Sequence, residues 1–119
     1  MRRTRINLHK TARNGALALV KKHIHPTVIN SSNLSGETPL FAAVRDAQQE
    51  VAELLLEHGA DATLPMTIGM IPLHMATNPE IVDALLKHEP DCLNTQDAYG
   101  QTPLFTAFTY KQVAVAHAL

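Results

Sequence analysis

A six-residue segment recurs along this chain at nearly constant spacing, and this recurrence limits the possible folds more than any other feature. The clear copies are Thr38–Ala43, Ile71–Ala76 and Thr102–Ala107. Their prolines, Pro39, Pro72 and Pro103, are 33 and 31 residues apart. A weaker copy without the proline lies upstream at Asn7–Ala12. A period of roughly 20–50 residues predicts an array of small, similar units rather than one globular core.

The Thr-Pro pairs at Thr38–Pro39 and Thr102–Pro103 have the features of a helix start. The threonine hydroxyl can accept a hydrogen bond from an exposed amide, and proline fits the first helical position. Leu40, Ala43 and Val44 share one helical face, so a short amphipathic helix is predicted that ends near Asp46–Ala47. A second helix is predicted from about Gln49 to His58. Each unit is therefore expected to be a hairpin of two short helices.

A glycine precedes each motif proline by three residues, at Gly36, Gly69 and Gly100. Glycine adopts the positive φ that a tight turn requires. We therefore expect similar turns between successive helical pairs, projecting from the array like fingers.

The motif Gly-x-Thr-Pro-Leu-His/Phe-x-Ala, followed by Val-x-x-Leu-Leu-Leu-Glu-His-Gly-Ala-Asp, closely resembles the ankyrin repeat, and Gly36–Asp61 is the strongest stretch. The likeness extends from about Arg5 to Leu119. It implies an all-α ankyrin-repeat solenoid of stacked helix-turn-helix pairs with projecting hairpin loops, forming a single domain over residues 1–119. The expected repeats are approximately 5–32, 33–65, 66–96 and 97–119, the last one truncated.

The chain departs from the family pattern at several positions. The third repeat has Ile71 in place of the capping threonine and lacks about three residues between its helices after Thr77, so an unusually short loop is expected there. Phe41 and Phe105 replace the motif histidine, and Asn7 replaces the first proline. These departures affect local geometry rather than the family assignment.

The resemblance implies that the turns and the exposed ends of the first helices line a concave groove that binds another protein. The matching positions are Leu34, Ser35, Glu37, Arg45, Asp46, Ile68, Met70, Asn78, Tyr99, Gln101, Thr109 and Tyr110. Leu34, Ile68, Met70, Tyr99 and Tyr110 are apolar or aromatic at positions that usually face water, and we expect binding energy there. The alternative is that Ile68 and Met70 only pack against adjoining turns.

Composition excludes several other function classes. Ten Lys and Arg against 11 Asp and Glu give a net charge of -1, which provides no overall field for nucleic acid or anionic membrane. No apolar run approaches the roughly 20 residues that span a bilayer, and no signal peptide is recognisable. The single cysteine, Cys92, excludes an internal disulfide. A cytoplasmic protein is expected, or one in the host cytosol if it is a delivered effector.

The sequence predicts no catalytic, cofactor-binding or metal-binding residues. His58 and His88 occupy equivalent places in successive repeats, but zinc would need further ligands that the spacing does not offer. Cys92 follows His88 by four positions without an oxyanion feature or a third orienting group. A partly buried thiol is the simpler interpretation.

Two functions are consistent with these features of the sequence. The leading hypothesis is a scaffold or adaptor that docks a protein segment without chemistry, and the alternative is a targeting or regulatory domain of a larger enzyme or microbial effector. Lys21, Lys22 and His23 give the first repeat the polar outer face of a cap. The segment 113–119 is almost wholly apolar, so we expect further chain, a second copy or another molecule to cover that edge.

Overall fold

The computed structural model describes residues 8–109 and 119 of the chain, and the regular elements within them are helical, with no strand. The elements are α1 (Leu8–Arg13), α2 (Leu17–His23), α3 (Pro39–Arg45), α4 (Gln49–Glu57), α5 (Pro72–Met75), α6 (Pro79–His88), the 3₁₀ helix η1 (Pro90–Asn94) and α7 (Pro103–Thr109). The all-α prediction is confirmed.

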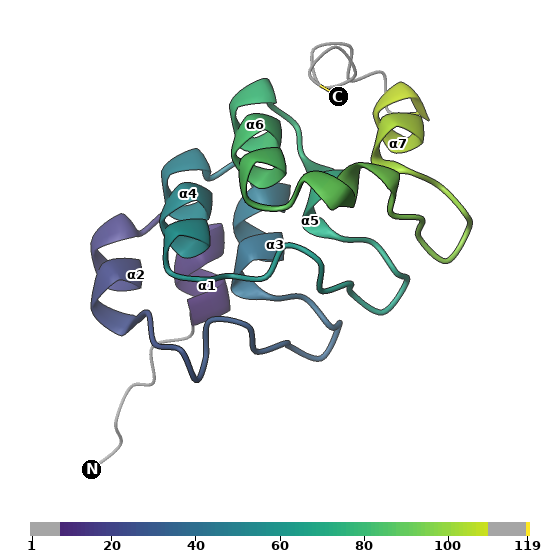
Figure 1. The fold of residues 1–119 in the computed structure, drawn as a ribbon. Helices are drawn as coiled ribbons and strands as arrows, with labels where there is room; N and C mark the ends of the chain where they lie inside the picture. The colour runs from purple at the N-terminus through teal and green to yellow at the C-terminus, as the bar shows by residue number, and fades with distance from the viewer. Residues whose placement is uncertain (1–7, 110–118) are drawn as a thin grey trace.

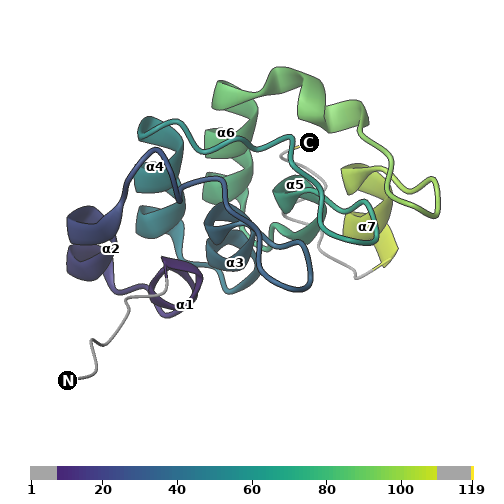
Figure 2. The ribbon, with the colours of Figure 1, turned by 90° about the horizontal axis from the view of Figure 1, so that it is seen from below.

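The helices stack in sequence order into an elongated body of 50 × 25 × 22 Å (Figure 1). One row consists of α1, α3, α5 and α7, each packed on the next, and a second row consists of α2, α4 and α6 (Figure 2). Each helical pair therefore contacts mainly its neighbours in the chain, which is the arrangement of a repeat solenoid.

The start and the burial of α3 illustrate why the repeated motif forms this unit. The hydroxyl of Thr38 accepts a hydrogen bond from the amide of Phe41 at 3.2 Å, and Pro39 occupies the first turn. Residues 39–44 are all buried, because α3 is packed between α1, α4 and α5. The prediction of an amphipathic helix was therefore wrong for residues 39–44, which are buried on every face because α3 lies in the middle of the stack.

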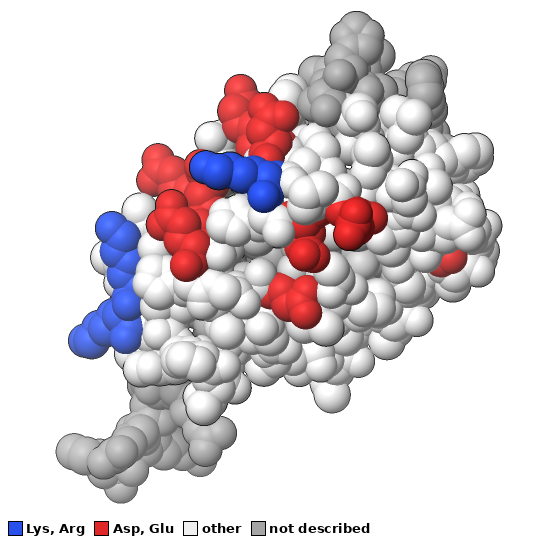
Figure 3. Space-filling model, in the orientation of Figure 1, with Lys and Arg blue, Asp and Glu red and all other residues white. Residues whose placement is uncertain are grey.

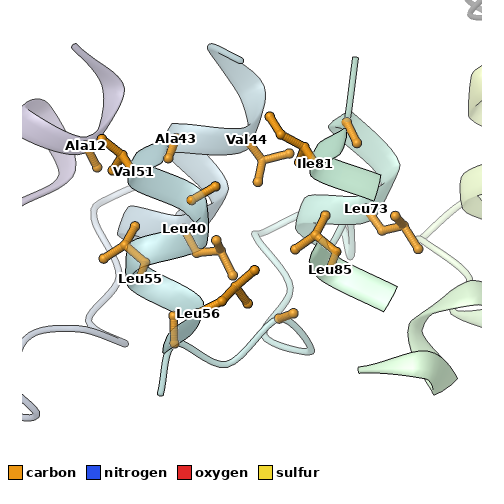
Figure 4. Close-up of a cluster of buried hydrophobic side chains, with 14 of the residues drawn as sticks. Ala12, Leu40, Ala43, Val44, Val51, Leu55, Leu56, Leu73, Ile81 and Leu85 are labelled. Carbon is orange, nitrogen blue, oxygen red and sulfur yellow. The ribbon is translucent and has the colours of Figure 1, made fainter. Parts of the chain in front are cut away.

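Equivalent side chains from successive repeats form the core, which Figure 4 shows at close range. Leu40 and Leu73 come from the first helices, and Leu55 and Leu85 come from the second helices. All four are buried in one cluster that runs through the repeats. Burial of each such side chain stabilises the fold by about 1.5–3 kcal/mol, so every repeat depends on its neighbours for stability.

Three turns project from one side of the stack, as Figure 1 shows. We name them finger 1 (Asn33–Glu37), finger 2 (Met66–Met70) and finger 3 (Asp97–Gln101); in each the first amide bonds to the carbonyl of the fifth residue. Adjacent fingers are joined by one backbone hydrogen bond, from Thr67 to the carbonyl of Ser35 at 3.2 Å and from Ala98 to the carbonyl of Ile68 at 2.9 Å. These bonds hold the fingers in a row with a common register.

The shortening of the third repeat falls on a helix and not on a loop. Helix α5 has four residues where α3 has seven, while three residues, 76–78, connect it to α6, as 46–48 connect α3 to α4. The expected short loop was therefore wrong. Asn78 caps α6 by accepting the amide of Ile81 at 2.8 Å, and the following Pro79 disfavours helical backbone at Asn78. The start of α6 is thus fixed, and the deletion shortens the end of α5.

Candidate functional site

The finger tips carry large apolar side chains that lie in solvent. Leu34 on finger 1 is fully exposed, Tyr99 on finger 3 is 75% exposed and Ile68 on finger 2 is 39% exposed. Ser35, beside Leu34, is also exposed, and its carbonyl accepts the amide of Thr67. Because the fingers are hydrogen bonded in a row, these apolar side chains form a series along one edge of the molecule.

Two fingers are held in shape by the side chain of their first residue. The Oδ1 atom of Asn33 accepts the amides two and four positions further on, both at 3.0 Å, and Asp97 does the same in finger 3, both at 2.9 Å. Sequence reasoning missed the role of these two residues. Their role could have been predicted from an Asn or Asp three positions before the turn glycine, because such side chains form hydrogen bonds with nearby backbone in turns.

Met70, which was expected to face water, is 8% exposed and joins the buried side chains. Its position ends finger 2, and the equivalent Glu37 and Gln101 are themselves half-buried. An apolar side chain at such a partly enclosed position turns inward, because this removes its surface from water. Met70 is therefore not available at the surface as expected, whereas Ile68 remains accessible.

Three of the expected contact residues meet in one ion-pair cluster. The guanidinium of Arg45, at the end of α3, contacts the carboxylate of Glu37 and lies 3.8 Å from that of Asp46. Glu37 also accepts a hydrogen bond from Asn33 at 3.2 Å. The charges of Arg45 and Glu37 are therefore largely satisfied within the chain, and Asp46 is the most exposed of the three charged groups in this cluster.

Four expected contact residues remain. Asn78 and Gln101 make hydrogen bonds within the chain, and Thr109 and Tyr110 are not described beyond the backbone of Thr109. The side-chain oxygen of Asn78 is used in capping α6. Gln101 is half-buried, and its carbonyl accepts a hydrogen bond from Nε2 of His74 at 2.8 Å. The side chain of Thr109 and the whole of Tyr110 lie outside the residues that the structure describes.

The face formed by the second helices is charged, unlike the finger tips. Figure 3 shows acidic side chains gathered over α4 and α6 and basic ones over α2. A shallow groove of about 360 Å³ between α4 and α6 is lined by Gln49, Glu53, Glu57, Glu80, Asp83, Ala84, Lys87 and His88. Sequence reasoning did not single out this groove. Within residues 8–109 and 119 no group of three His, Cys, Asp or Glu side chains is placed to hold a metal ion.

The Cys92 thiol is buried and lies 3.7 Å from the carbonyl of Ala62. Burial, with smaller contributions from the carboxylates of Glu89, Asp61 and Asp91, raises its pKa from 9.0 to about 11. The reactive form of a cysteine is the thiolate, which this environment disfavours. The geometry therefore favours a structural role for Cys92 over a nucleophilic one.

Comparison with known proteins identifies the class to which this stack belongs. A family model described as ankyrin repeats, in three copies, matches residues 8–92. The chain therefore belongs to the ankyrin-repeat family, whose repeats are general protein–protein interaction modules and are typically non-catalytic. The expected fourth repeat, which begins with finger 3 and α7, lies beyond the matched residues. No helix among those that the structure describes is long and apolar enough to cross a membrane.

Several curated proteins are similar to most of the chain. Human Rabankyrin-5 is 33% identical over 71% of this chain, and human Inversin is 31% identical over 94% of it. The ANK repeat-containing protein nipk-1 of Caenorhabditis elegans is 41% identical over 67%. The matched parts are 7%, 12% and 14% of these relatives, so the chain spans only a small fraction of their length.

Proposed function

We propose that this chain is a scaffold or adaptor module that binds a segment of another protein across the finger tips and the exposed end of α3. The observation that supports the proposal is the exposed apolar series formed by Leu34, Ile68 and Tyr99 on three hydrogen-bonded fingers. Exposed apolar groups in a contiguous series, and tyrosine in particular, are typical of interaction surfaces.

Burial of these tips would provide substantial binding energy. A leucine side chain that passes from full exposure to burial contributes about 1.5–3 kcal/mol, and an aromatic ring contributes at least as much. The fingers are already ordered by their glycines and hydrogen bonds, so little further ordering is needed on binding. The partner we expect is a protein segment with apolar side chains, held by mass action without covalent chemistry and in the cytoplasm.

The test is selection of binding peptides from a displayed random library against the immobilised chain. The wild type is compared with the double variant Leu34→Ser/Tyr99→Ser, which removes the two most exposed tips. The matched control is Leu19→Ser, because Leu19 is 42% exposed on α2, away from the fingers. Circular dichroism shows whether each variant retains the helical fold.

We expect the wild type and the Leu19→Ser control to bind the selected peptides equally and the double variant to bind them at least about tenfold more weakly. Peptides rich in apolar residues should dominate the selection. Equal binding by the double variant would place the interaction elsewhere on the molecule and refute the proposal.

A further inference from the structure

The face formed by the second helices carries charges of both signs, which are separated across it. Figure 3 shows basic side chains over α2 and acidic ones over α4 and α6. The lysines of α2 lie in its last turn and are Lys21 and Lys22. Four carboxylates line the groove of about 360 Å³ between α4 and α6, those of Glu53, Glu57, Glu80 and Asp83. The same face therefore presents a basic edge and an acidic groove.

These opposite charges are not neutralised by one another. Among the residues that the structure describes, the salt bridges are those of Arg45 with Glu37 and with Asp46, at the end of α3. Lys21 and Lys22 are both exposed. Since solvated charges of both signs remain on one face, this face is complementary in charge to a second copy of itself.

The charges are also separated along the helix axes. Acidic residues lie in the first two turns of both groove helices, and these are Glu50, Glu53, Glu80 and Asp83. The last turns hold charges of both signs, with Glu57 in α4 and Lys87 in α6. Helices α2, α4 and α6 are equivalent parts of successive repeats and run in the same direction (Figure 1). The acidic end of the groove therefore lies beside the start of α2 and not beside its lysines.

This distribution favours an antiparallel contact between two copies. A second copy that laid its α2 parallel to α4 and α6 would bring its lysines next to Lys87. When the second copy is turned by half a turn about an axis perpendicular to the face, the lysines of α2 instead meet the acidic end of the groove. Such a two-fold axis makes the same contact twice, because α2 of each copy then lies over the groove of the other.

We propose that two copies of this chain associate through this face, with α2 of each copy antiparallel to α4 and α6 of the other and its lysines over the acidic end of the groove. A single exposed ion pair contributes little, so the contact depends on several pairs acting together and is weak. It also depends on ionic strength, because salt screens exposed charges. The fingers extend beyond the ends of the helices (Figure 1), so the association is separate from the proposed binding at their tips.

The first measurement is sedimentation equilibrium of the wild type at protein concentrations up to about 1 mM, which detects even a very weak dimer. It is carried out at ionic strengths of about 0.1 M and about 1 M, where the Debye length is about 10 Å and about 3 Å. We expect dimers at the lower ionic strength and a dissociation constant at least about tenfold larger at the higher one. A wild type that remains monomeric at the lower ionic strength, or a dimer that salt does not weaken, overturns the proposal.

Charge reversal identifies the two surfaces that meet. The first variant, Lys21→Glu/Lys22→Glu, makes α2 acidic, and the second, Glu53→Lys/Asp83→Lys, reverses two carboxylates of the groove. Each variant alone should dimerise at least about tenfold more weakly than the wild type. The matched control is Arg13→Glu, which should dimerise as the wild type does, because Arg13 is exposed on α1 in the other row of helices. Circular dichroism shows whether each variant keeps the helical fold.

A mixture of the two variants separates a direct contact from a general effect of charge. In a mixed dimer the acidic α2 of the first variant meets the altered groove of the second, and the lysines of the second meet the unaltered groove of the first. The mixture should therefore form dimers about as strongly as the wild type. Failure of the mixture to associate, while both variants remain folded, overturns the proposal.

A basic segment of a different protein is the competing occupant of the groove, and the peptide tetralysine is the probe for it. Its binding is followed by the NMR chemical shifts of α4 and α6. If the wild type stays monomeric yet binds tetralysine, and Glu53→Lys/Asp83→Lys abolishes this binding, the groove serves such a segment and the self-association is overturned. Neither result affects the peptide selection at the finger tips, so the two proposals fail independently.

Discussion

Gly15 and Ala47 occupy the same place in successive repeats, and both have a left-handed backbone, with φ of 71° and 57°. Each donates its amide to a carbonyl three residues earlier, Gly15 to Ala12 at 3.2 Å and Ala47 to Val44 at 3.1 Å. Glycine adopts this conformation without a penalty, whereas the Cβ of alanine costs about 1–2 kcal/mol there. The second repeat therefore carries a strained turn that the first repeat avoids.

Replacement of Ala47 by glycine is expected to stabilise the fold. The side chain of Ala47 is exposed, so little packing is lost, and the relief of strain exceeds the entropy that glycine adds to the unfolded chain. We expect Ala47→Gly to raise the free energy of unfolding by about 0.5–1 kcal/mol, measured by urea denaturation followed by circular dichroism.

The reciprocal variant Gly15→Ala is the matched comparison. A Cβ at Gly15 would clash with the side-chain oxygen of Gln48, whose amide nitrogen donates to the carbonyl of Arg13. We expect a loss of about 1–3 kcal/mol from backbone strain and the displaced Gln48. A drop in stability for Ala47→Gly as large as that for Gly15→Ala would show that the left-handed turn is not strained.

The turn glycines of fingers 2 and 3 differ in what surrounds them, although both have positive φ. A Cβ at Gly69 would lie 2.9 Å from the backbone nitrogen of Ala98 on the next finger, while a Cβ at Gly100 would meet no described atom within 4 Å. Gly69→Ala is therefore expected to destabilise the fold by about 1–3 kcal/mol more than Gly100→Ala. Thermal or urea unfolding of the two variants measures this difference; equal losses would mean that the fingers do not pack as closely as described.

The repeat architecture could be predicted because its signals are local. Thr38 and Pro39 define a helix start by their own chemistry, and the recurrence of the motif defines the unit that stacks. The position of the deletion in the third repeat could not be predicted in the same way. It depends on Asn78 and Pro79 holding the start of α6, and on the core holding α6 in register with α4.

The candidate site was less predictable than the fold, because exposure is a tertiary property. Leu34 and Tyr99 lie at turn tips, where the sequence pattern alone indicates solvent. Met70 lies at a position of the repeat that usually faces water, yet its side chain is only 8% exposed. Arg45 was expected to meet a partner, yet its nearest carboxylate belongs to Glu37 in its own chain.

His74 holds the start of α5 by accepting the amide of Ile71, a different amide from the one that a threonine cap at position 71 would accept. Its Nδ1 atom accepts the amide of Ile71 at 3.1 Å, and its Nε2 atom donates to the carbonyl of Gln101 at 2.8 Å, although the ring is 4% exposed. His74→Phe introduces the residue type that the second repeat has at the equivalent position, Phe41. It leaves the buried amide of Ile71 without a hydrogen-bond partner. We expect a loss of about 1–3 kcal/mol in urea denaturation.

The exposed His58 provides the control for His74, since its ring contacts only the carbonyl of Leu54 among the described hydrogen bonds. His58→Phe should change stability by less than about 0.5 kcal/mol. If His74→Phe were equally harmless, the capping role of the imidazole would be disproved.

The buried Cys92 thiol predicts a specific loss of stability in alkaline solution. Burial raises its pKa from 9.0 to about 11, so the folded chain retains the proton in a range where the unfolded chain releases it. The resulting stabilisation is fully present below pH 9 and is lost as the pH rises through about 11. The variant Cys92→Ala lacks this contribution at every pH, and other alkaline titrations are common to both chains.

Urea unfolding at pH 8 and pH 10.5 separates the thiol from these other groups. We expect the wild type to lose about 1–2 kcal/mol more than Cys92→Ala between the two pH values, because the unfolded wild type gains an ionised thiolate that the buried site resists. The substitution itself lowers the free energy of unfolding at both pH values by leaving a small cavity. The quantity to compare is therefore the loss between pH 8 and pH 10.5 in the wild type and the same loss in Cys92→Ala. Parallel losses in the two chains would mean that the thiol ionises as readily in the folded state as in the unfolded state, and that η1 does not seal Cys92 from water.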